Sequence, residues 1–351
     1  MNSTDAVHKL STQSARSKAP VFVLGCPRSG TTVLYHMLLS AGNFAIYRAE
    51  SNVFTVLQPR FGNLARRSRR NELLRSWLRS NLFEKTGLDA ESIRRRINED
   101  CNGAGDFLRI VMEEVAKKQG VERWADCTPD HLLYMKEIKR QIPNALIVHI
   151  IRDGRDVALS YMKQGWSHPL PWDSDKELLV VGLFWEWIVR RGRTYGRQLG
   201  PDYYEVRYED LVQKPHETLA HLGEFVGQAL DYEQIQRVGV GSVSKPNSSF
   251  ASEDFRPLHR WATKMSLEEL ERFEALTGNF LQELGYPLAS ARKHSDFRAR
   301  QLKLTYRLWF SARHWLKTTT PLGRFTAIGR MAVHASGTQV SAIPDNRSLC
   351  D

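Results

Sequence analysis

Two short apolar runs stand out in the pattern of hydrophobic and polar positions along the chain. They cover Val21–Leu24 and Ala145–Ile151, are rich in β-branched residues, and are bounded by glycine, proline or charged residues. Such runs are typical of parallel strands that are buried on both faces of a sheet. A segment with helical spacing of apolar positions follows each run. This alternation predicts an α/β fold with three layers, in which helices cover both faces of a parallel sheet.

Other segments predict the remaining elements of the domain. Phe44–Arg48 predicts a short second strand, and Tyr203–Arg207 predicts a strand that continues into a helix. Helical spacing predicts helices over residues 60–100, 107–118, 183–191, 219–226 and 267–284, the last ended by Gly285 and Pro287.

The segment after the first predicted strand indicates an anion site. Between Gly25 and Gly30 the spacing matches the nucleoside-triphosphate loop G-x-x-x-x-G-K-[ST], but Thr31 stands in place of the lysine. The loop contains one cation, Arg28. A strand, a glycine-rich loop and a helix together direct backbone N–H groups at an anion. The pattern therefore favours a phosphate site without Mg²⁺ over a Mg-ATP site.

A second anion site is predicted where the other apolar run ends. Arg152 follows this strand, and Ser160 lies about two turns into the next helix. The two side chains could share one anion. The structural alternative is that Arg152 pairs with Asp153 or Asp156, and Arg155 is expected either to face solvent or to pair with a carboxylate.

At these residues the chain resembles the sulfotransferases that use 3′-phosphoadenosine 5′-phosphosulfate. The P-R-S-G-T-T motif is similar to a branch that includes bacterial and tyrosylprotein sulfotransferases, and the resemblance extends from about residue 20 to 287. It implies the P-loop NTPase-like sulfotransferase fold, this sulfonucleotide as co-substrate, and no metal. It assigns the 3′-phosphate to Arg152 and Ser160. It assigns the 5′-phosphosulfate to Pro27, Arg28, Ser29, Gly30, Thr31 and Thr32.

The resemblance also implies a general base and shows one departure from the family pattern. Glu50 corresponds to the glutamate that takes the acceptor proton; the alternative is a carboxylate in the first turn of a helix. Relatives often have a lysine where this chain has Cys127. Either another cation such as Arg28 supplies the missing charge, or the enzyme is weak, specialised or inactive. His131 could assist, although a structural role is favoured.

Two further segments carry assignments from the resemblance. Lys245, Asn247 and Ser248 lie in a polar loop that closes over the donor in relatives, so either phosphate contact or a plain surface loop is expected. Arg207 and Glu209 belong to an R-Y-E-D-L segment and are expected to be structural ion-pair partners.

Composition and charge narrow the partners. The 351 residues are 42% hydrophobic and 25% charged, as in globular proteins, and the net charge is +11. The four cysteines have no metal-ligand spacing. A cluster of arginines over residues 66–96 indicates a solvated helical face or a rim that attracts an anionic acceptor; no motif supports nucleic-acid binding.

We expect three parts: a disordered arm over residues 1–19, a sulfotransferase domain over 20–288, and a basic helical extension over 289–351 with a disordered end. The apolar and basic stripe at 294–317 suits docking on the domain or peripheral contact with a membrane. No secretory signal or membrane-spanning run is present, which favours a cytoplasmic protein.

The sequence therefore predicts a sulfotransferase that moves a sulfuryl group to an acceptor hydroxyl on a glycan, lipid, small molecule or tyrosyl group. The alternatives are a P-loop kinase-like phosphotransferase and a degenerate nucleotide-binding protein that docks at membranes. The acceptor and the oligomeric state remain open.

Overall fold

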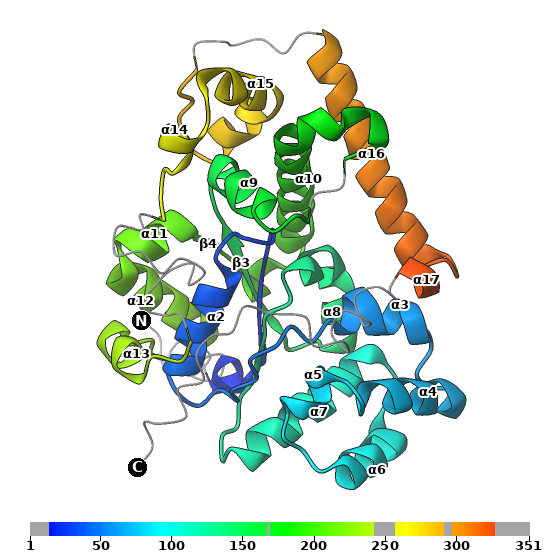
Figure 1. Cartoon of the computed structure of the whole chain (residues 1–351). Coiled ribbons are helices and arrows are strands. Elements are labelled where there is room, and N and C mark those ends of the chain that lie inside the picture. Colours follow the sequence, from blue (N-terminus) through cyan, green and yellow to red (C-terminus); the bar gives the residue numbers. More distant parts are fainter. Residues whose placement is uncertain (1–13, 167–168, 242–256, 291–296, 327–351) are drawn as a thin grey trace.

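The computed structural model describes residues 14–166, 169–241, 257–290 and 297–326 (Figure 1). At its centre is a parallel sheet with the strand order β2-β1-β3-β4. The strands are β1 (Val21–Gly25), β2 (Ala125–Asp126), β3 (Leu146–Ile151) and β4 (Tyr203–Arg207). The two apolar runs pair with each other, from Val21 opposite Leu146 to Gly25 opposite Ile150. Their carboxyl ends therefore meet at one edge of the sheet.

Alternate side chains of the central strands enter two separate cores. Val21 and Val23 of β1 pack into one core, and Phe22 and Leu24 pack into the other. Helices on the first face are α2 (Thr31–Ser40), α11 (Tyr208–Gln213), α12 (Pro215–Val226) and α13 (Tyr232–Val238). Helices on the second face are α7 (Ala104–Lys118), α8 (Met135–Gln141), α9 (Gly154–Met162), α10 (Glu177–Arg197) and α15 (Leu267–Glu283). The predicted three-layer arrangement is confirmed.

The chain between α2 and α7 forms a helical subdomain that packs against the second core. It contains the π-helix η1 (Val53–Leu57), α3 (Gln58–Phe61), α4 (Arg67–Trp77), α5 (Asn81–Glu84) and α6 (Ala90–Asp100). The ring of Trp77 packs edge-on against Phe83 and Phe107, with centroids 5.0 and 5.1 Å apart. These contacts fasten the subdomain to α7, and the predicted helices over residues 60–100 are confirmed.

Short elements complete the described chain. They are the 3-10 helices η2 (Pro129–Tyr134), η3 (Pro171–Lys176) and η4 (Gly200–Asp202), and the helices α14 (Trp261–Lys264), α16 (Phe297–Thr319) and α17 (Gly323–Thr326). None of the helices in the described ranges combines the length and the apolar character needed to cross a bilayer.

The predicted strand over Phe44–Arg48 is wrong. Only a single bridge forms there, between Phe44 and Arg123. The side chain of Gln119 bonds both backbone groups of Ile46, accepting from its N–H at 2.7 Å and donating to its carbonyl at 3.0 Å. A side-chain amide thus occupies the groups that a neighbouring strand would need.

The described part of the predicted disordered arm is ordered. Residues 14–18 are helical, and Arg16 donates to the carbonyls of Phe225 at 2.8 Å and Pro201 at 2.7 Å. The buried Arg123 guanidinium in turn donates to the carbonyl of Arg16 at 2.9 Å. Residues 14–19 therefore pack against the domain. Residues 1–13 and the expected disordered C-terminal end lie outside the described residues.

Candidate functional site

The loop between β1 and α2 is wound tightly at the carboxyl edge of the sheet. Arg28 has a φ of 75° and Gly30 a φ of 97°, so both adopt left-handed backbone conformations. A Cβ on Gly30 would lie 2.3 Å from the ring of Tyr208, which leaves glycine as the residue that fits. For Arg28 the left-handed conformation costs about 1–2 kcal/mol. Strain of this kind often accompanies functional loops.

The two predicted anion motifs meet at this edge. The Arg28 guanidinium donates from Nε to Ser160 Oγ at 3.0 Å. The buried Arg152 donates from Nη1 to the Arg28 carbonyl at 3.2 Å and from Nη2 to the Pro257 carbonyl at 2.5 Å. The structure thus places the loop, the end of β3 and helix α9 around one cluster of polar groups.

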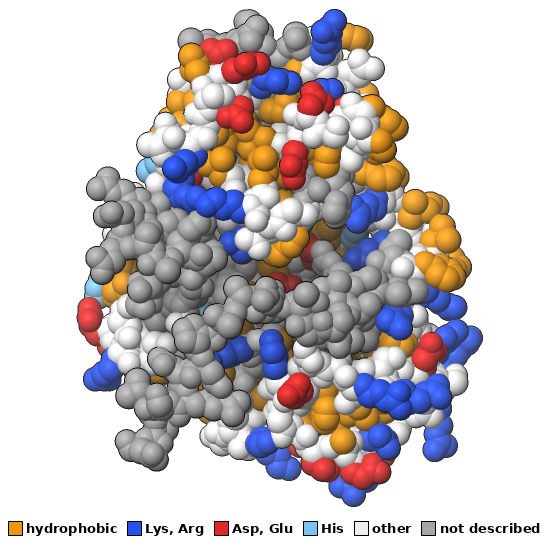
Figure 2. All heavy atoms as spheres, in the orientation of Figure 1, with side chains coloured by type: hydrophobic (Ala, Val, Ile, Leu, Met, Phe, Trp, Pro, Cys, Tyr) orange, Lys and Arg blue, Asp and Glu red, His pale blue; other side chains and the backbone are white. Residues whose placement is uncertain are grey.

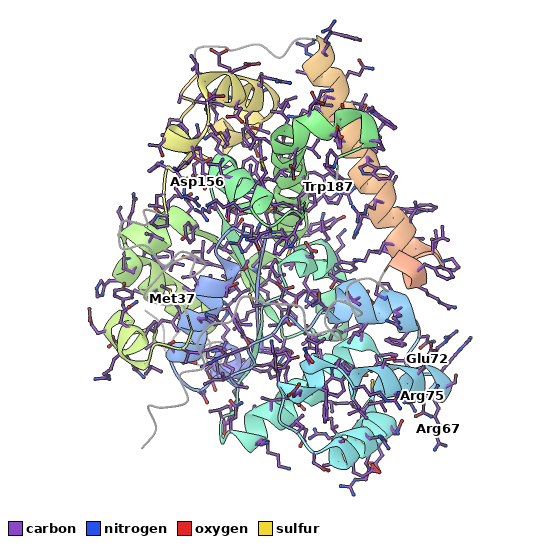
Figure 3. The ribbon with its side chains drawn as sticks, in the orientation of Figure 1. Met37, Arg67, Glu72, Arg75, Asp156 and Trp187 are labelled. Carbon is purple, nitrogen blue, oxygen red and sulfur yellow. The ribbon has the colours of Figure 1, made fainter. Side chains whose placement is uncertain are left out.

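Positive charge accumulates in this cluster. Burial lowers the pKa of Arg28, and the nearby charges of Arg152 and Arg260 lower it further. Burial and Arg152 likewise lower the pKa of Arg260, just before α14. Among the described residues, the carboxylate of Asp156 on α9, labelled in Figure 3, interacts with this group; burial raises its pKa and Arg152 lowers it. The three guanidinium groups outnumber this carboxylate, and the excess positive charge favours an anionic ligand.

Several buried polar atoms in the cluster have no hydrogen-bond partner within the described ranges. They include the possible donors Ser29 Oγ and Arg152 Nε, and the acceptor Asp156 Oδ2. Buried donors are nearly always paired, so an unpaired pair of donors beside excess positive charge is a place for ligand oxygens. A nucleotide carrying two separate phosphate groups fits this donor set. Sequence reasoning missed Arg260, because no local pattern links the residue before α14 to the loop after β1.

Glu50 and Cys127 lie next to the same loop. The charge of Glu50 acts on the Cys127 thiol, whose pKa is raised well above its ordinary value, first by burial and then by Glu50. The side chain of Thr31 hydrogen-bonds to this thiol. Glu50 is exposed and lies two residues before Asn52, the N-cap residue of η1, whose first turn contains no acidic residue.

Cys127 cannot take over the function of a lysine. Because burial raises its pKa, the thiol stays neutral near pH 7, where it is neither a cation nor a strong nucleophile. Arg28, the cation of the loop itself, remains the residue predicted to supply that positive charge.

His131 has the structural role that the sequence favoured. It is fully buried, its Nδ1 lies 2.9 Å from Asp126 Oδ2, and its Nε2 accepts from the backbone N–H of Phe54 at 3.1 Å. Since Nε2 accepts, the proton is on Nδ1 and is donated to Asp126. The ring thus ties η1 to the strand end at β2.

The predicted ion pair between Arg207 and Glu209 is wrong. Arg207 donates to the carbonyl of Leu284 at 2.7 Å, and its nearest carboxylate is Asp210 at 3.9 Å. Glu209 accepts from the backbone N–H of Asp153 at 2.9 Å and from the hydroxyl of Tyr286 at 2.9 Å. Both side chains hold the C-terminal part of the domain against the site, by bonds to the backbone and to tyrosine. Lys245, Asn247 and Ser248 lie outside the described residues.

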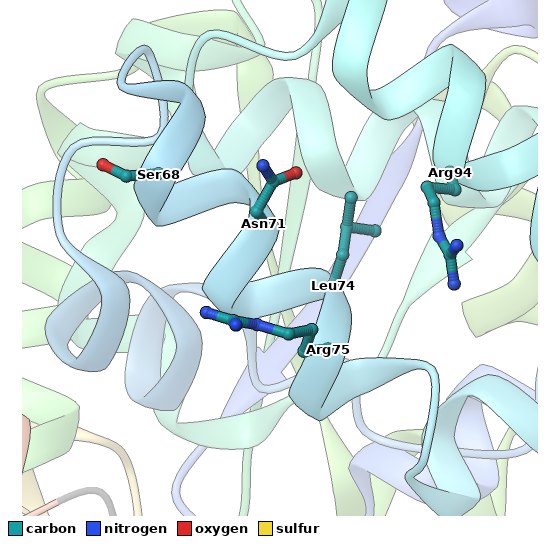
Figure 4. A pocket seen from close by; sticks show the side chains of 5 residues that line it. All are labelled: Ser68, Asn71, Leu74, Arg75 and Arg94. Carbon is teal, nitrogen blue, oxygen red and sulfur yellow. The ribbon is translucent and has the colours of Figure 1, made fainter.

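Many arginines of the helical subdomain are already occupied. Arg69 pairs with Glu72 at 2.8 Å, and Arg70 donates to the carbonyls of Leu64 and Ala65 at 2.9 Å. A shallow depression of about 450 Å³ lies between α4 and α6 (Figure 4); it is lined by Ser68, Asn71, Leu74, Arg75 and Arg94. It lies in the helical subdomain, whereas the guanidinium cluster lies at the edge of the sheet. The occupied side chains favour the solvated-face interpretation for most of this surface.

Comparison with known proteins identifies the family. Residues 20–232, more than half of the chain, match the model of the sulfotransferase family. The chain belongs to the sulfotransferase family. The sulfotransferase match includes both anion motifs and stops before α14.

Sequence relatives of this sulfotransferase-family chain cover it only in part. An uncharacterized protein of Aquifex aeolicus (strain VF5) is 26% identical over 247 residues, 66% of this chain and 29% of that protein. Sulfotransferase 1A1 of Bos taurus is 26% identical over 156 residues, 40% of this chain and 53% of that protein. Carbohydrate sulfotransferase 2 of Mus musculus is 33% identical over 89 residues, 24% of this chain and 17% of that protein. The chain thus spans at most about half the length of these relatives.

Solved structures confirm the sulfotransferase fold. The sulfotransferase domain from the curacin biosynthetic pathway matches with a TM-score of 0.54 and 17% identity, covering 77% of this chain and 98% of that one. The sulfotransferase domain of the Synechococcus PCC 7002 olefin synthase matches with a TM-score of 0.50 and 17% identity, covering 84% and 94%. Both likenesses concern the fold of the chain.

Proposed function

We propose that this member of the sulfotransferase family transfers a sulfuryl group from 3′-phosphoadenosine 5′-phosphosulfate to the hydroxyl of an acceptor. The observation that carries the proposal is the meeting of Arg28, Arg152 and Ser160, with 3.0 Å between Arg28 Nε and Ser160 Oγ. The family match supports the same reaction. A single phosphate loop would serve many nucleotides; the second cationic group at the end of β3 favours a donor with a second phosphate.

In this proposal each residue has a role in one displacement. Glu50 accepts the proton of the acceptor hydroxyl while the oxygen of that hydroxyl forms a bond to sulfur. At the same time, the bond between sulfur and the 5′-phosphate oxygen breaks. Arg28, Ser29 and the backbone N–H groups through Thr32 stabilise the charge that develops on the departing phosphate. Arg152 and Ser160 fix the 3′-phosphate. Since guanidinium groups supply the positive charge, the reaction as proposed requires no metal ion.

The class of acceptor is inferred from what the proposed reaction requires. Any acceptor must bring a hydroxyl to the Glu50 side of the loop, which glycans, lipids, small molecules and tyrosyl peptides can all do. The net charge of +11 favours an anionic acceptor over a cationic one.

Calorimetric titration with adenosine 3′,5′-bisphosphate, with Mg-ATP as the control ligand, tests the donor. We expect tight binding of the bisphosphate and weak binding of Mg-ATP, because Thr31 replaces the lysine that a triphosphate loop needs. Binding of Mg-ATP alone would return the site to the kinase-like phosphotransferases. Binding of neither ligand would indicate a degenerate, non-catalytic protein.

The Glu50→Gln variant tests the proposed base. Loss of the base should lower turnover by about 10²–10⁴-fold, while the affinity for the bisphosphate stays unchanged. Asp130→Asn serves as a matched control, because it also removes a carboxylate near a buried cysteine of this edge. If Glu50→Gln instead abolished bisphosphate binding, Glu50 would be a structural residue of the donor site.

A further inference from the structure

Helix α16 has one side packed on the domain. The hydroxyl of the buried Tyr306 donates to Asp173 Oδ2 at 3.1 Å and accepts from the backbone N–H of Leu170 at 3.0 Å. Trp187 of α10, labelled in Figure 3, donates from Nε1 to Ser311 Oγ at 3.1 Å. Lys303 pairs with Glu186 at 2.8 Å. The prediction that this helix docks on the domain is therefore confirmed. The same contacts show which side of α16 faces away from the domain.

The opposite side of α16 carries an apolar stripe, here called the outer stripe. It consists of Phe297, Leu304, Leu308 and Trp315, which are 80, 56, 61 and 56% exposed. Spacings of seven and four residues place these side chains on one face of a helix. Leu322 and Phe325, next to and in α17, extend the exposed apolar surface with 53 and 70% exposure. Figure 2 shows hydrophobic side chains gathered at the right edge, where Figure 1 has α17 and the adjoining end of α16.

All charged residues in the segment that carries the outer stripe are basic. Residues 297–326 contain no aspartate or glutamate, and their basic residues are Arg298, Arg300, Lys303, Arg307, Arg313, Lys317 and Arg324. Arg307 and Arg313 of this segment are exposed. The exposed Trp309 and Trp315 add the side chains that favour the boundary between headgroups and acyl chains.

We propose that the outer stripe binds the surface of an anionic lipid bilayer, with α16 lying in the plane of the interface. A second copy of the chain would bring two sets of cations together with no carboxylate between them, which repels. A nucleic acid would match the charge but would leave the apolar stripe in water. An anionic bilayer satisfies both features, since phosphates meet the arginines and the acyl region receives the apolar side chains. This inference is independent of the sulfuryl-transfer proposal.

Co-sedimentation of the full chain with vesicles tests this inference. We expect binding to phosphatidylcholine vesicles that contain phosphatidylserine, little binding to pure phosphatidylcholine, and weaker binding as salt rises. The triple variant Leu304→Ser, Leu308→Ser, Trp315→Ser should lower the partition coefficient by at least about tenfold, because it removes the apolar part of the contact. Arg307→Gln and Arg313→Gln should each lower it roughly fivefold.

A matched control replaces exposed apolar residues elsewhere. Val238→Ser with Leu267→Ser removes side chains that are 52 and 69% exposed, on α13 and α15, and should leave vesicle binding unchanged. Circular dichroism checks that all variants fold. Equal binding to neutral and anionic vesicles, or equal binding of the triple variant and the unaltered chain, would overturn the inference. So would a lipid-free dimer, seen by light scattering, that the triple variant abolishes.

Discussion

Two buried arginines that are three residues apart have opposite surroundings. Arg155 is 1% exposed and is matched by two carboxylates: Asp153 at 2.7 Å and Glu274 at 2.6 Å. Its pKa is raised overall, although burial acts against this. Arg152 is fully buried, donates to two backbone carbonyls, and keeps Nε without a partner among the described residues. The fold gives Arg155 two direct ion pairs, whereas Arg152 has the charge of Asp156 nearby but no direct ion pair among the described residues.

These surroundings distinguish a structural arginine from a ligand-binding one. A buried charge is costly unless it is paired, so a cation that the protein completes by itself is part of the fold. A cation that is desolvated and surrounded by other cations, as Arg152 is by Arg28 and Arg260, raises the affinity for an anion instead. Substitutions at the two positions should therefore fail in different ways.

The largest effect is expected for Arg155→Met. Removing this guanidinium leaves Asp153 and Glu274 buried without their cation, which should lower the free energy of unfolding by about 3–5 kcal/mol. Urea denaturation of the variant and the unaltered chain measures the difference. A loss below about 1 kcal/mol would mean that Arg155 is not the structural partner that its contacts indicate.

The matched variant is Arg152→Met, which keeps the aliphatic part of the side chain. We expect its affinity for adenosine 3′,5′-bisphosphate to fall by about 100-fold or more, since charge-assisted hydrogen bonds to the 3′-phosphate are lost. Its stability without ligand should change much less than that of Arg155→Met. Calorimetry and urea denaturation on both variants decide; a variant that is unstable yet binds normally would reverse the assigned roles.

A buried histidine, His149, lies three residues before Arg152 in the sequence. Burial lowers the pKa of His149 to about 4, so the ring is neutral near pH 7. The unfolded chain binds this proton near pH 6.5 and the folded chain only near pH 4, so stability falls as the pH drops through this window. The contribution is at most about 3 kcal/mol at pH 4.

The His149→Gln variant isolates that contribution. Its stability should decline less steeply between pH 6.5 and 4 than that of the unaltered chain, as measured by urea denaturation at several pH values. A remaining slope is expected, because the pKa values of His36 and His314 are also lowered to about 4, mainly by burial. Identical slopes would show that His149 does not titrate differently in the two states.

The smallest effect is expected for Cys127→Ala. Because the thiol is neutral and buried, its removal should change turnover by no more than about threefold. Steady-state kinetics with the acceptor found by screening provides the measurement. A loss like that of Glu50→Gln would instead give the thiol a part in the reaction.

The sheet and the loop could be predicted because their signals are local. The apolar runs at β1 and β3 and the glycine spacing of the loop each lie within about ten residues of sequence. The structure brings Ser160 to Arg28 and Arg28 to Arg152. That Arg152 and Ser160 share an anion stays a prediction. The roles of Glu50 and of the loop residues stay predictions that the proposed experiments test.

What could not be predicted depends on contacts between distant segments. The strand over Phe44–Arg48 does not form because the side chain of Gln119, just after α7, bonds both backbone groups of Ile46. Arg207 turns to a carbonyl at the end of α15 rather than to Glu209. Arg260 joins the cluster only because Asp156 accepts from the backbone N–H of Trp261 at 3.0 Å, which holds the segment before α14 against α9. No local pattern encodes any of these partners.

The contacts of the Glu274 carboxylate limit how far the chain can be shortened from its C-terminal end. Besides Arg155, it accepts from the backbone N–H groups of Ala289 at 3.1 Å and Ser290 at 2.9 Å, and from the hydroxyl of Ser290 at 2.6 Å. The family match ends at residue 232, well before these groups. A fragment cut there would carry both anion motifs on a backbone whose supporting arginine had lost half of its anchorage. We therefore expect the smallest piece of this protein that folds on its own to extend at least through Ser290.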